Sequence, residues 1–406
     1  LKHLDALQTL VDEYDLSENG ELRYVAVGMG RPLRTLSLPQ DNKIDTLMVP
    51  AAGLKKIDLS QTKQLKLLGI DNNYELSQLD LTGMKQLRDL SCEGNSLTSL
   101  NLSDCRTLDT LGCNNNQLSA LDVSGLDKLE ILTCFSNDLS SLNLTGCTSL
   151  KSLDCSVNSK LNTADYPRSL TSLNCSSCSF SQIETVKLPL LTNLTCDGNQ
   201  IGTLDLSAQT KLTAVNCSNN KIKQLDFSNC VNLLDVVIAG NPINGGISFA
   251  NCNNLRYVSV NNTRLDACAL NDMYRSLREK RPEDENNDLD GILLFNNVPG
   301  AVEVSRTQIA TDKGWLVSNV GDGTGCQEDG IAKVSTESQL YVNATDNGWV
   351  IGNLPADARE VLLTTLGGQV VARYHVTAPS LRVKAPRKGV YIVSVDGGNS
   401  KVCIRK

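Results

Sequence analysis

Cysteine is the residue whose number and spacing most invite a chemical interpretation, because the chain contains 15 of them. Thiols can act as nucleophiles, ligate metal ions, form disulfides or serve as small buried hydrophobic groups. Seven recur in one frame, two residues after a Leu or Val and three before an Asn or Cys: Cys92, Cys113, Cys134, Cys155, Cys175, Cys196 and Cys217. Which of these chemistries applies depends on the elements that carry the thiols.

Other catalytic side chains are scarce. The chain has 2 His, His3 and His375, near opposite ends, and neither lies in a signature such as G-x-S-x-G. No Cys and His are spaced as a zinc site. Cys175 and Cys178 have the spacing of a redox dithiol, but Cys178 stands where other repeats carry Asn, and no helix N-terminus activates either thiol. The sequence therefore predicts no catalytic residue, no metal site, no cofactor and no enzymatic activity.

One enzymatic alternative rests on the acidic residues at outward strand positions, which could include a pair of catalytic carboxylates. A solvated acidic face is the simpler interpretation.

The cysteines belong to an internal repeat. The frame Leu-x-x-Leu-x-Cys returns about every 21 residues. It persists without Cys at Leu65/Leu68/Ile70, Leu233/Val236/Ile238 and Leu255/Val258/Val260. Weaker turns begin at Leu22 and Ile44, so the sequence predicts about twelve turns in all.

Each turn has the pattern of a short parallel strand. Alternate strand residues share a side, so the second Leu and the Cys should enter the core while their neighbours face outward. Adjacent strands lie about 4.7–4.9 Å apart with parallel side chains, which suits stacked thiols better than disulfides between turns. The Asn after each Cys should bond backbone groups where the chain leaves the strand. This predicts a structural ladder of Asn95, Asn116, Asn137, Asn199 and Asn220 beside the cysteine column.

The combined pattern resembles the leucine-rich repeat family, whose signature L-x-x-L-x-L-x-x-N/C-x-L is matched from about Leu65 to Leu265. The short period is similar to that of the bacterial class. The resemblance implies a right-handed solenoid with one parallel β-sheet, which we assign to residues 22–264.

Both ends of a solenoid need caps. Residues 1–21 are expected to form the N-terminal cap, with an amphipathic helix over residues 1 to about 14 on the helical spacing of Leu4, Leu7, Leu10 and Val11. Residues 265–320 are expected to form the C-terminal cap, with a helix from Leu265 to Arg281. This ending resembles the caps of leucine-rich repeat proteins of the Bacteroidetes.

The composition changes after Asn319. Residues 321–330 are predicted to be a flexible polar linker. Residues 331–406 contain short alternating runs broken by Gly-Gly and Pro, which predicts a small antiparallel β-sandwich.

This last segment resembles the C-terminal sorting domain of the type IX secretion system. The matched positions are Leu366, Gly368, Gly389, Tyr391, Val393, Val395, Lys401 and Val402. The resemblance implies that an outer-membrane secretion machinery recognises residues 331–406. An accessory sandwich without a sorting role is the alternative.

Charge and hydropathy argue against two further classes. The net charge of −7 disfavours nucleic acid, which needs a basic surface, and no run of about 18 apolar residues could span a membrane. Near the start, Asp15, Ser17, Asn19 and Glu21 have offsets like those of a calcium loop. Ala26 stands where the bidentate Glu is expected, so a turn without calcium is the preferred interpretation.

The outward strand positions form the candidate binding surface. Most are small and polar, whereas binding energy usually comes from large anchors, so we predict contacts at Ile131, Phe135 and Tyr257. Acidic residues share this face: Asp89, Glu93, Asp154 and Asp197. We expect a secreted or cell-surface, non-enzymatic protein that binds an extracellular protein or glycan. A structural cell-envelope component is the alternative.

Overall fold

The computed structural model describes residues 1–40, 43–282, 284, 292–326, 341–345, 348–352, 354, 359–365, 369–377, 380–384, 389–395 and 400–405. The chain divides into two compact units, Leu1–Cys326 and Gln327–Lys406. Each unit has its own hydrophobic core.

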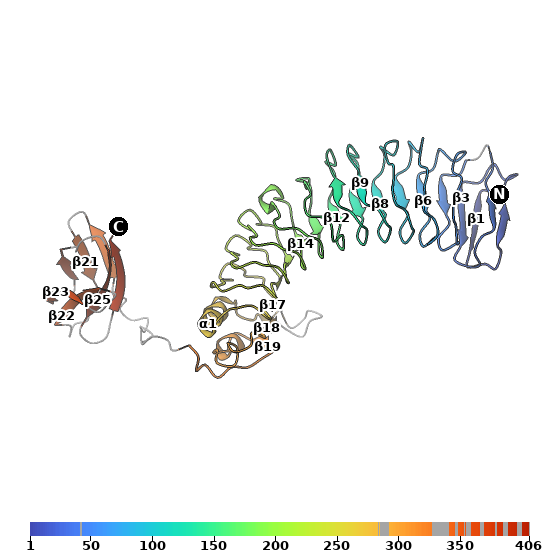
Figure 1. Ribbon diagram of the computed structural model, residues 1–406. Coiled ribbons are helices and arrows are strands. Elements are labelled where there is room, and N and C mark those ends of the chain that lie inside the picture. The colour runs from blue at the N-terminus through green and yellow to red at the C-terminus, as the bar shows by residue number, and fades with distance from the viewer. Residues whose placement is uncertain are drawn as a thin grey trace. The chain divides into compact units, whose positions relative to one another are not determined.

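The first unit is a stack of short parallel strands, and Figure 1 shows them following one another in chain order. Fifteen strands form one sheet: β1 (His3–Leu7), β3 (Tyr24–Gly28), β5 (Thr46–Met48), β6 (Leu67–Gly69), β7 (Asp89–Ser91), β8 (Thr110–Gly112), β10 (Ile131–Thr133), β12 (Ser152–Asp154), β13 (Ser172–Asn174), β14 (Asn193–Thr195), β15 (Ala214–Asn216), β16 (Asp235–Val237), β17 (Tyr257–Ser259), β18 (Ile292–Phe295) and β19 (Trp315–Val317). Successive strands pair with their central residues opposite each other, as Leu132 pairs with Leu111 on one side and Leu153 on the other.

The alternation along each strand sets the two sides of the sheet. In β7, Leu90 is buried and Asp89 is exposed, and Cys92 directly after the strand is buried again. Outside the main sheet, the repeats form two small parallel pairs, β2 (Glu13–Asp15) with β4 (Thr35–Ser37) and β9 (Ala120–Asp122) with β11 (Ser141–Asn143). The short 3₁₀ helix η1 (Thr185–Lys187) lies in a later turn. The sheet side away from this core is called the strand face below.

The N-terminal segment is not the predicted helical cap, because it forms another turn of the solenoid. Strand β1 pairs in parallel with β3, with Leu4 opposite Val25, and β2 follows it. Leu4 and Ala6 alternate and pack against the core, whereas Leu10 is 74% exposed. The helix prediction was wrong because a segment beside an open sheet edge gains backbone hydrogen bonds by pairing, and a short isolated helix is marginal in water.

The C-terminal end of the first unit contains the helix expected there. Helix α1 spans Ala267–Ser276, and the Asp266 side chain caps it by accepting a hydrogen bond from the Ala269 N–H at 2.8 Å. Four apolar residues at helical spacing are buried: Leu270, Met273, Tyr274 and Leu277. The short helix α2 (Gln308–Thr311) precedes the last strand, β19.

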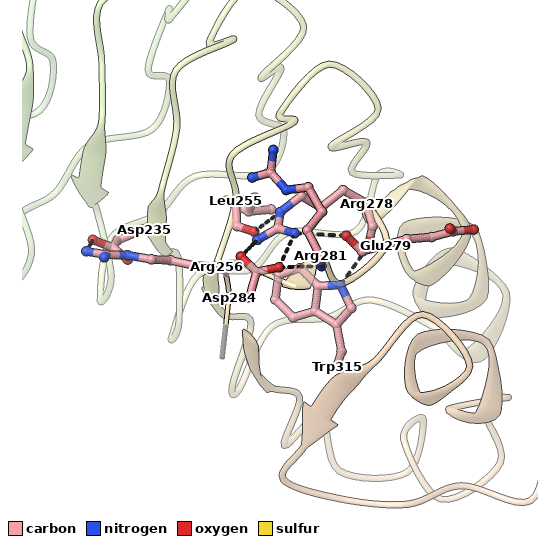
Figure 2. A network of polar contacts seen from close by, with 8 residues as sticks. All are labelled: Asp235, Leu255, Arg256, Arg278, Glu279, Arg281, Asp284 and Trp315. Carbon is pink, nitrogen blue, oxygen red and sulfur yellow. Dashed lines mark hydrogen bonds and ion pairs between the residues drawn. The ribbon is translucent and has the colours of Figure 1, made fainter. Parts of the chain in front are cut away.

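A buried ion pair fastens the end of α1 to the last turns (Figure 2). The side chains of Arg278 and Asp284 are each only 7% exposed, and two N–H groups of the guanidinium donate to the two carboxylate oxygens at 2.7 Å. Arg278 Nε also donates to the Leu255 carbonyl, and Trp315 Nε1 donates to the Arg278 carbonyl at 2.9 Å. The guanidinium holds the pKa of Asp284 below its usual value. The pair is therefore ionised at neutral pH and couples three segments of the chain.

Residues 321–326, the first part of the predicted linker, pack against the first unit. The N–H groups of Asp322, Gly323 and Gly325 donate to the carbonyl groups of residues 303, 305 and 304 at 2.8–3.0 Å. Cys326 then forms a disulfide with Cys268 of α1. The remaining predicted linker residues, 327–330, lie outside the described residues.

The second unit has two antiparallel sheets. One contains β20 (Tyr341–Thr345), β21 (Gly348–Gly352) and β24 (Ser380–Val383), and the other contains β23 (Val370–His375), β22 (Glu360–Thr365), β25 (Gly389–Val395) and β26 (Ser400–Arg405). Trp349 and Ile351 of the first sheet share one core with Val361, Leu363 and Val393 of the second. Two sheets enclosing one core constitute a β-sandwich.

The segment matched to a sorting domain lies largely in this sandwich. Gly389, Tyr391, Val393 and Val395 belong to β25, which pairs with β26, where Lys401 and Val402 lie. Leu366 and Gly368 lie outside the described residues.

Candidate functional site

The cysteine column is a stack of buried thiols. All seven members are 0% exposed, and none is disulfide-bonded. Burial raises the pKa of Cys113 and of Cys217 to about 12. Thiols in this state remain protonated at neutral pH, so they pack as small hydrophobic groups and are poor nucleophiles or metal ligands.

Cys178 takes the place of an Asn beside this column. It is buried, and its thiol donates a weak hydrogen bond to the Cys155 carbonyl at 3.4 Å. Burial raises its pKa as well. This environment is the reverse of the electropositive, accessible one that activates a redox dithiol.

Each Asn of the ladder links two turns. Nδ2 of Asn116 donates to the carbonyls of Cys92 and Cys113 at 2.9 and 3.1 Å, and its Oδ1 accepts from the Leu97 N–H at 2.9 Å. The same arrangement recurs at Asn137, Asn199 and Asn220. Asn95 donates to the carbonyls of Ile70 and Cys92 in the same way, but its Oδ1 accepts from the Asn73 N–H. Because the ladder satisfies buried backbone groups at every turn, it fixes the positions of the outward side chains on the strand face.

The acidic candidates on the strand face fall into two groups. Asp154 accepts from Ser156 Oγ at 2.6 Å and from Asn174 Nδ2 at 2.9 Å, and Asp197 accepts from Ser176 Oγ at 2.7 Å and from Asn216. Neutral Ser and Asn side chains therefore hold these two carboxylates through hydrogen bonds that run from strand to strand across the face. Asp89 and Glu93 lie elsewhere on the face, in a depression.

The three predicted anchors do not come together. Ile131 is 43% exposed on β10 and lines the depression. Phe135 is half-buried and lies outside its lining. Tyr257 is on β17, where its ring packs against Phe295 with centroids 5.5 Å apart. The structure thus joins Ile131 with Asp89 and Glu93, and it separates them from Phe135 and Tyr257.

The depression has a volume of about 460 Å³ and spans five neighbouring strands, β5 to β8 and β10. Its apolar walls include Met48, Leu67 and Ile131, and its acidic lining residues are Asp71, Asp89 and Glu93. Such a hollow with a few polar groups can hold one or two side chains of a partner.

The depression exists because two positions of its floor are glycines. Gly69 and Gly112 occupy the position after the central Leu, where most turns carry a larger side chain. A Cβ on Gly112 would lie 2.5 Å from Glu93 Oε1, so only glycine allows that carboxylate to lie across β8. Met48, Leu67 and both glycines are not among the predicted site residues, although two glycines at the same position of the repeat are a signal that can be read from the sequence.

The remaining sequence candidates form no catalytic or metal centre within the described residues. The His3 ring stacks on Tyr24 with centroids 4.1 Å apart, and His375 is exposed in the second unit. Asp15 accepts a hydrogen bond from the Ser17 N–H at 3.1 Å, closing a turn. The described part of the chain contains no group of three or more His, Cys, Asp or Glu placed to hold a metal ion. Among its helices, none has the length and apolar character needed to cross a membrane.

The parallel sheet, the Leu and Cys columns and the Asn ladder together define a leucine-rich repeat fold. The functional domain of InlJ from Listeria monocytogenes, which includes a cysteine ladder, is similar, with a TM-score of 0.63 and 19% identity over 100% of this chain and 81% of that one. A leucine-rich repeat protein from Leptospira interrogans has a TM-score of 0.50 and 19% identity, covering 68% of this chain and 82% of its own. A chain of the LRIM1/APL1C complex has a TM-score of 0.56 and 18% identity, and the match covers 70% of this chain and 55% of that one.

Family models and curated proteins give no match to the chain. The structural similarities therefore establish the fold, which is of the type found in bacterial leucine-rich repeat proteins.

Proposed function

We propose that this chain is a secreted or cell-surface binding protein without enzymatic activity, which recognises an extracellular protein or glycan through the strand face. The depression between β5 and β10 is the observation that carries this proposal. The depression offers both apolar walls and charged groups, which are the features of a recognition site.

Two features support the proposed location outside the cell. The Cys268–Cys326 disulfide is of the kind that persists in oxidising compartments. The sorting-domain resemblance of residues 331–406 supports export through an outer-membrane secretion machinery. The mass of the mature protein on the surface and in the medium tests this: a species ending near residue 330, or modified there, is expected, whereas intact protein found only inside cells contradicts it.

Binding by the strand face is tested with the full-length chain and two matched variants. Ile131→Asp places a charge in the depression, and Val186→Asp makes the same change at another exposed apolar residue, 50% exposed in η1. Each variant is immobilised and presented with surface proteins and glycans from cells that meet the protein. We expect a ligand that wild type and Val186→Asp retain and Ile131→Asp loses, at similar thermal stability.

If no retained ligand depends on Ile131, the proposal fails and the structural cell-envelope alternative gains support.

A further inference from the structure

The three carboxylates of the depression lack the neutralisation found elsewhere in the first unit. Asp71, Asp89 and Glu93 have no ion-pair partner among the described residues, and no Lys or Arg is among the residues lining the depression. Four other acidic residues of the first unit are paired within the chain: Asp109 with Arg88, Glu130 with Lys151, Asp138 with Lys160, and Asp235 with Arg256. Asp154 and Asp197 of the strand face are held by neutral donors, but they lie outside the depression.

Neutral donors hold two of these carboxylates in place. Asp71 Oδ1 accepts from Ser91 Oγ at 2.6 Å and from the Glu93 N–H at 3.0 Å, while Glu93 Oε2 accepts from Asn114 Nδ2 at 3.2 Å. These hydrogen bonds orient the side chains without cancelling their charge. Asp89 is exposed beside them. The depression is therefore a preorganised site of negative charge.

The walls restrict which cation suits the site. Met48, Leu67 and Ile131 offer aliphatic surface, from which a hydrated metal ion gains little. An Arg or Lys side chain combines an apolar stem with a cationic head, and the stem can pack on aliphatic walls while the head meets the carboxylates.

From the charge and the apolar walls together, we propose that the depression binds a basic segment of a partner protein, with an Arg or Lys side chain seated over Gly69, Ser91 and Gly112 and an adjacent apolar residue against Ile131. This inference rests on the proposed function and specifies the ligand class.

The test uses a defined probe with the full-length chain. The peptide tetramethylrhodamine-Gly-Leu-Arg-Val-Arg-Leu-Gly-amide is compared with the same labelled peptide carrying citrulline in place of both Arg, which removes the charge and keeps the shape. Fluorescence anisotropy should show binding of the Arg peptide below about 1 mM and weaker binding at high salt. Asp89→Asn should weaken binding of the Arg peptide about tenfold, because a hydrogen bond to a charged group typically contributes at least a tenfold factor in affinity.

Asp127→Asn is the matched control, because it removes the same charge from an exposed loop residue outside the depression. It should leave the affinity within about twofold. Equal binding of the Arg and citrulline peptides, no binding of either, or an equal effect of the two Asn variants overturns the inference. A calorimetric signal with CaCl2 alone, and none with the peptide, also overturns it and assigns the carboxylates to a metal.

These outcomes are separable from failure of the proposed function. If a cell-surface ligand is lost on Ile131→Asp but binds Asp89→Asn normally, the strand face binds a partner and only the basic ligand class is wrong. If neither change affects any ligand, both proposals fail.

Discussion

The residue before each ladder position adopts a left-handed backbone conformation, where most turns use Gly or Asn. Those turns carry Asn72, Gly94, Asn115, Gly198, Asn219, Gly240 and Asn262. Val157 is the β-branched exception, with φ of 54°. A side chain branched at Cβ is strained there, because it approaches the following carbonyl oxygen.

Val157→Asn should therefore stabilise the first unit by about 1 kcal/mol. The loss of apolar burial is small, since Val157 is already 51% exposed. Urea denaturation of the full-length chain measures the change in free energy of unfolding. Val186→Asn, a similarly exposed valine without positive φ, should be near neutral; a Val157 variant no more stable than wild type would contradict the strain argument.

At the level of single residues, the side chains at repeated positions could be placed from the sequence, whereas features specific to one part of the solenoid could not. Cys113 and Asn116 could be placed because many turns in phase reveal the inward positions. The depression could not be derived from any one turn, because it arises where Gly69 and Gly112 flank Ser91 on adjacent strands. The separation of Tyr257 from Ile131, by contrast, follows from the repeat frame, which places the two residues several turns apart.

At the level of elements, strand pairing determined the structure of a segment whose local sequence pattern suggested a helix. The spacing of Leu4 and Leu7 suited a helix, but the open edge of β3 made a strand the better solution. Helix α1 was predictable because its apolar residues keep helical spacing and Asp266 caps it. The partners Cys268 and Cys326 were not, because 58 positions separate them and no repeat relates them.

The same disulfide leads to a prediction for the end of the first unit. It closes a loop of 58 residues, for which the chain-entropy account predicts up to about 4 kcal/mol of stabilisation. The Cys268→Ser/Cys326→Ser variant should exchange the amide hydrogens of Asp322, Gly323 and Gly325 faster, with little change at β10. Hydrogen exchange measures this. Reductant should reproduce the effect in wild type and add nothing in the variant; equal protection with and without the disulfide would show that the hydrogen bonds alone hold the segment.

At the level of the whole molecule, the buried thiols make the stability of the first unit sensitive to alkaline pH. Burial raises the pKa of Cys113 from 9.0 to about 12, and the pKa values of the other described free thiols are raised too. A raised pKa in the folded state stabilises the fold fully below the unfolded-state pKa. That stabilisation is lost as pH rises toward the folded-state value.

The free energy of unfolding should therefore fall between pH 9 and 11, and Cys113→Ala should reduce the slope by about 1.4 kcal/mol per pH unit. Urea denaturation at several pH values measures both slopes. Comparing variant with wild type cancels the titration of Lys and Tyr. Identical slopes would mean that Cys113 ionises as readily in the folded state as in the unfolded state.

The in-register pairing of the strands has a consequence for how the gene can change. Leu111, Leu132 and Leu153 occupy equivalent places in successive strands, so removing one whole turn would bring equivalent residues together and keep the columns intact. Duplicating a turn would lengthen the sheet in the same way, because each turn contacts only its neighbours. Insertions of other lengths would have to bulge out of the columns. Recombination between repeats can thus change the number of turns between the depression and either end of the solenoid while the fold stays the same.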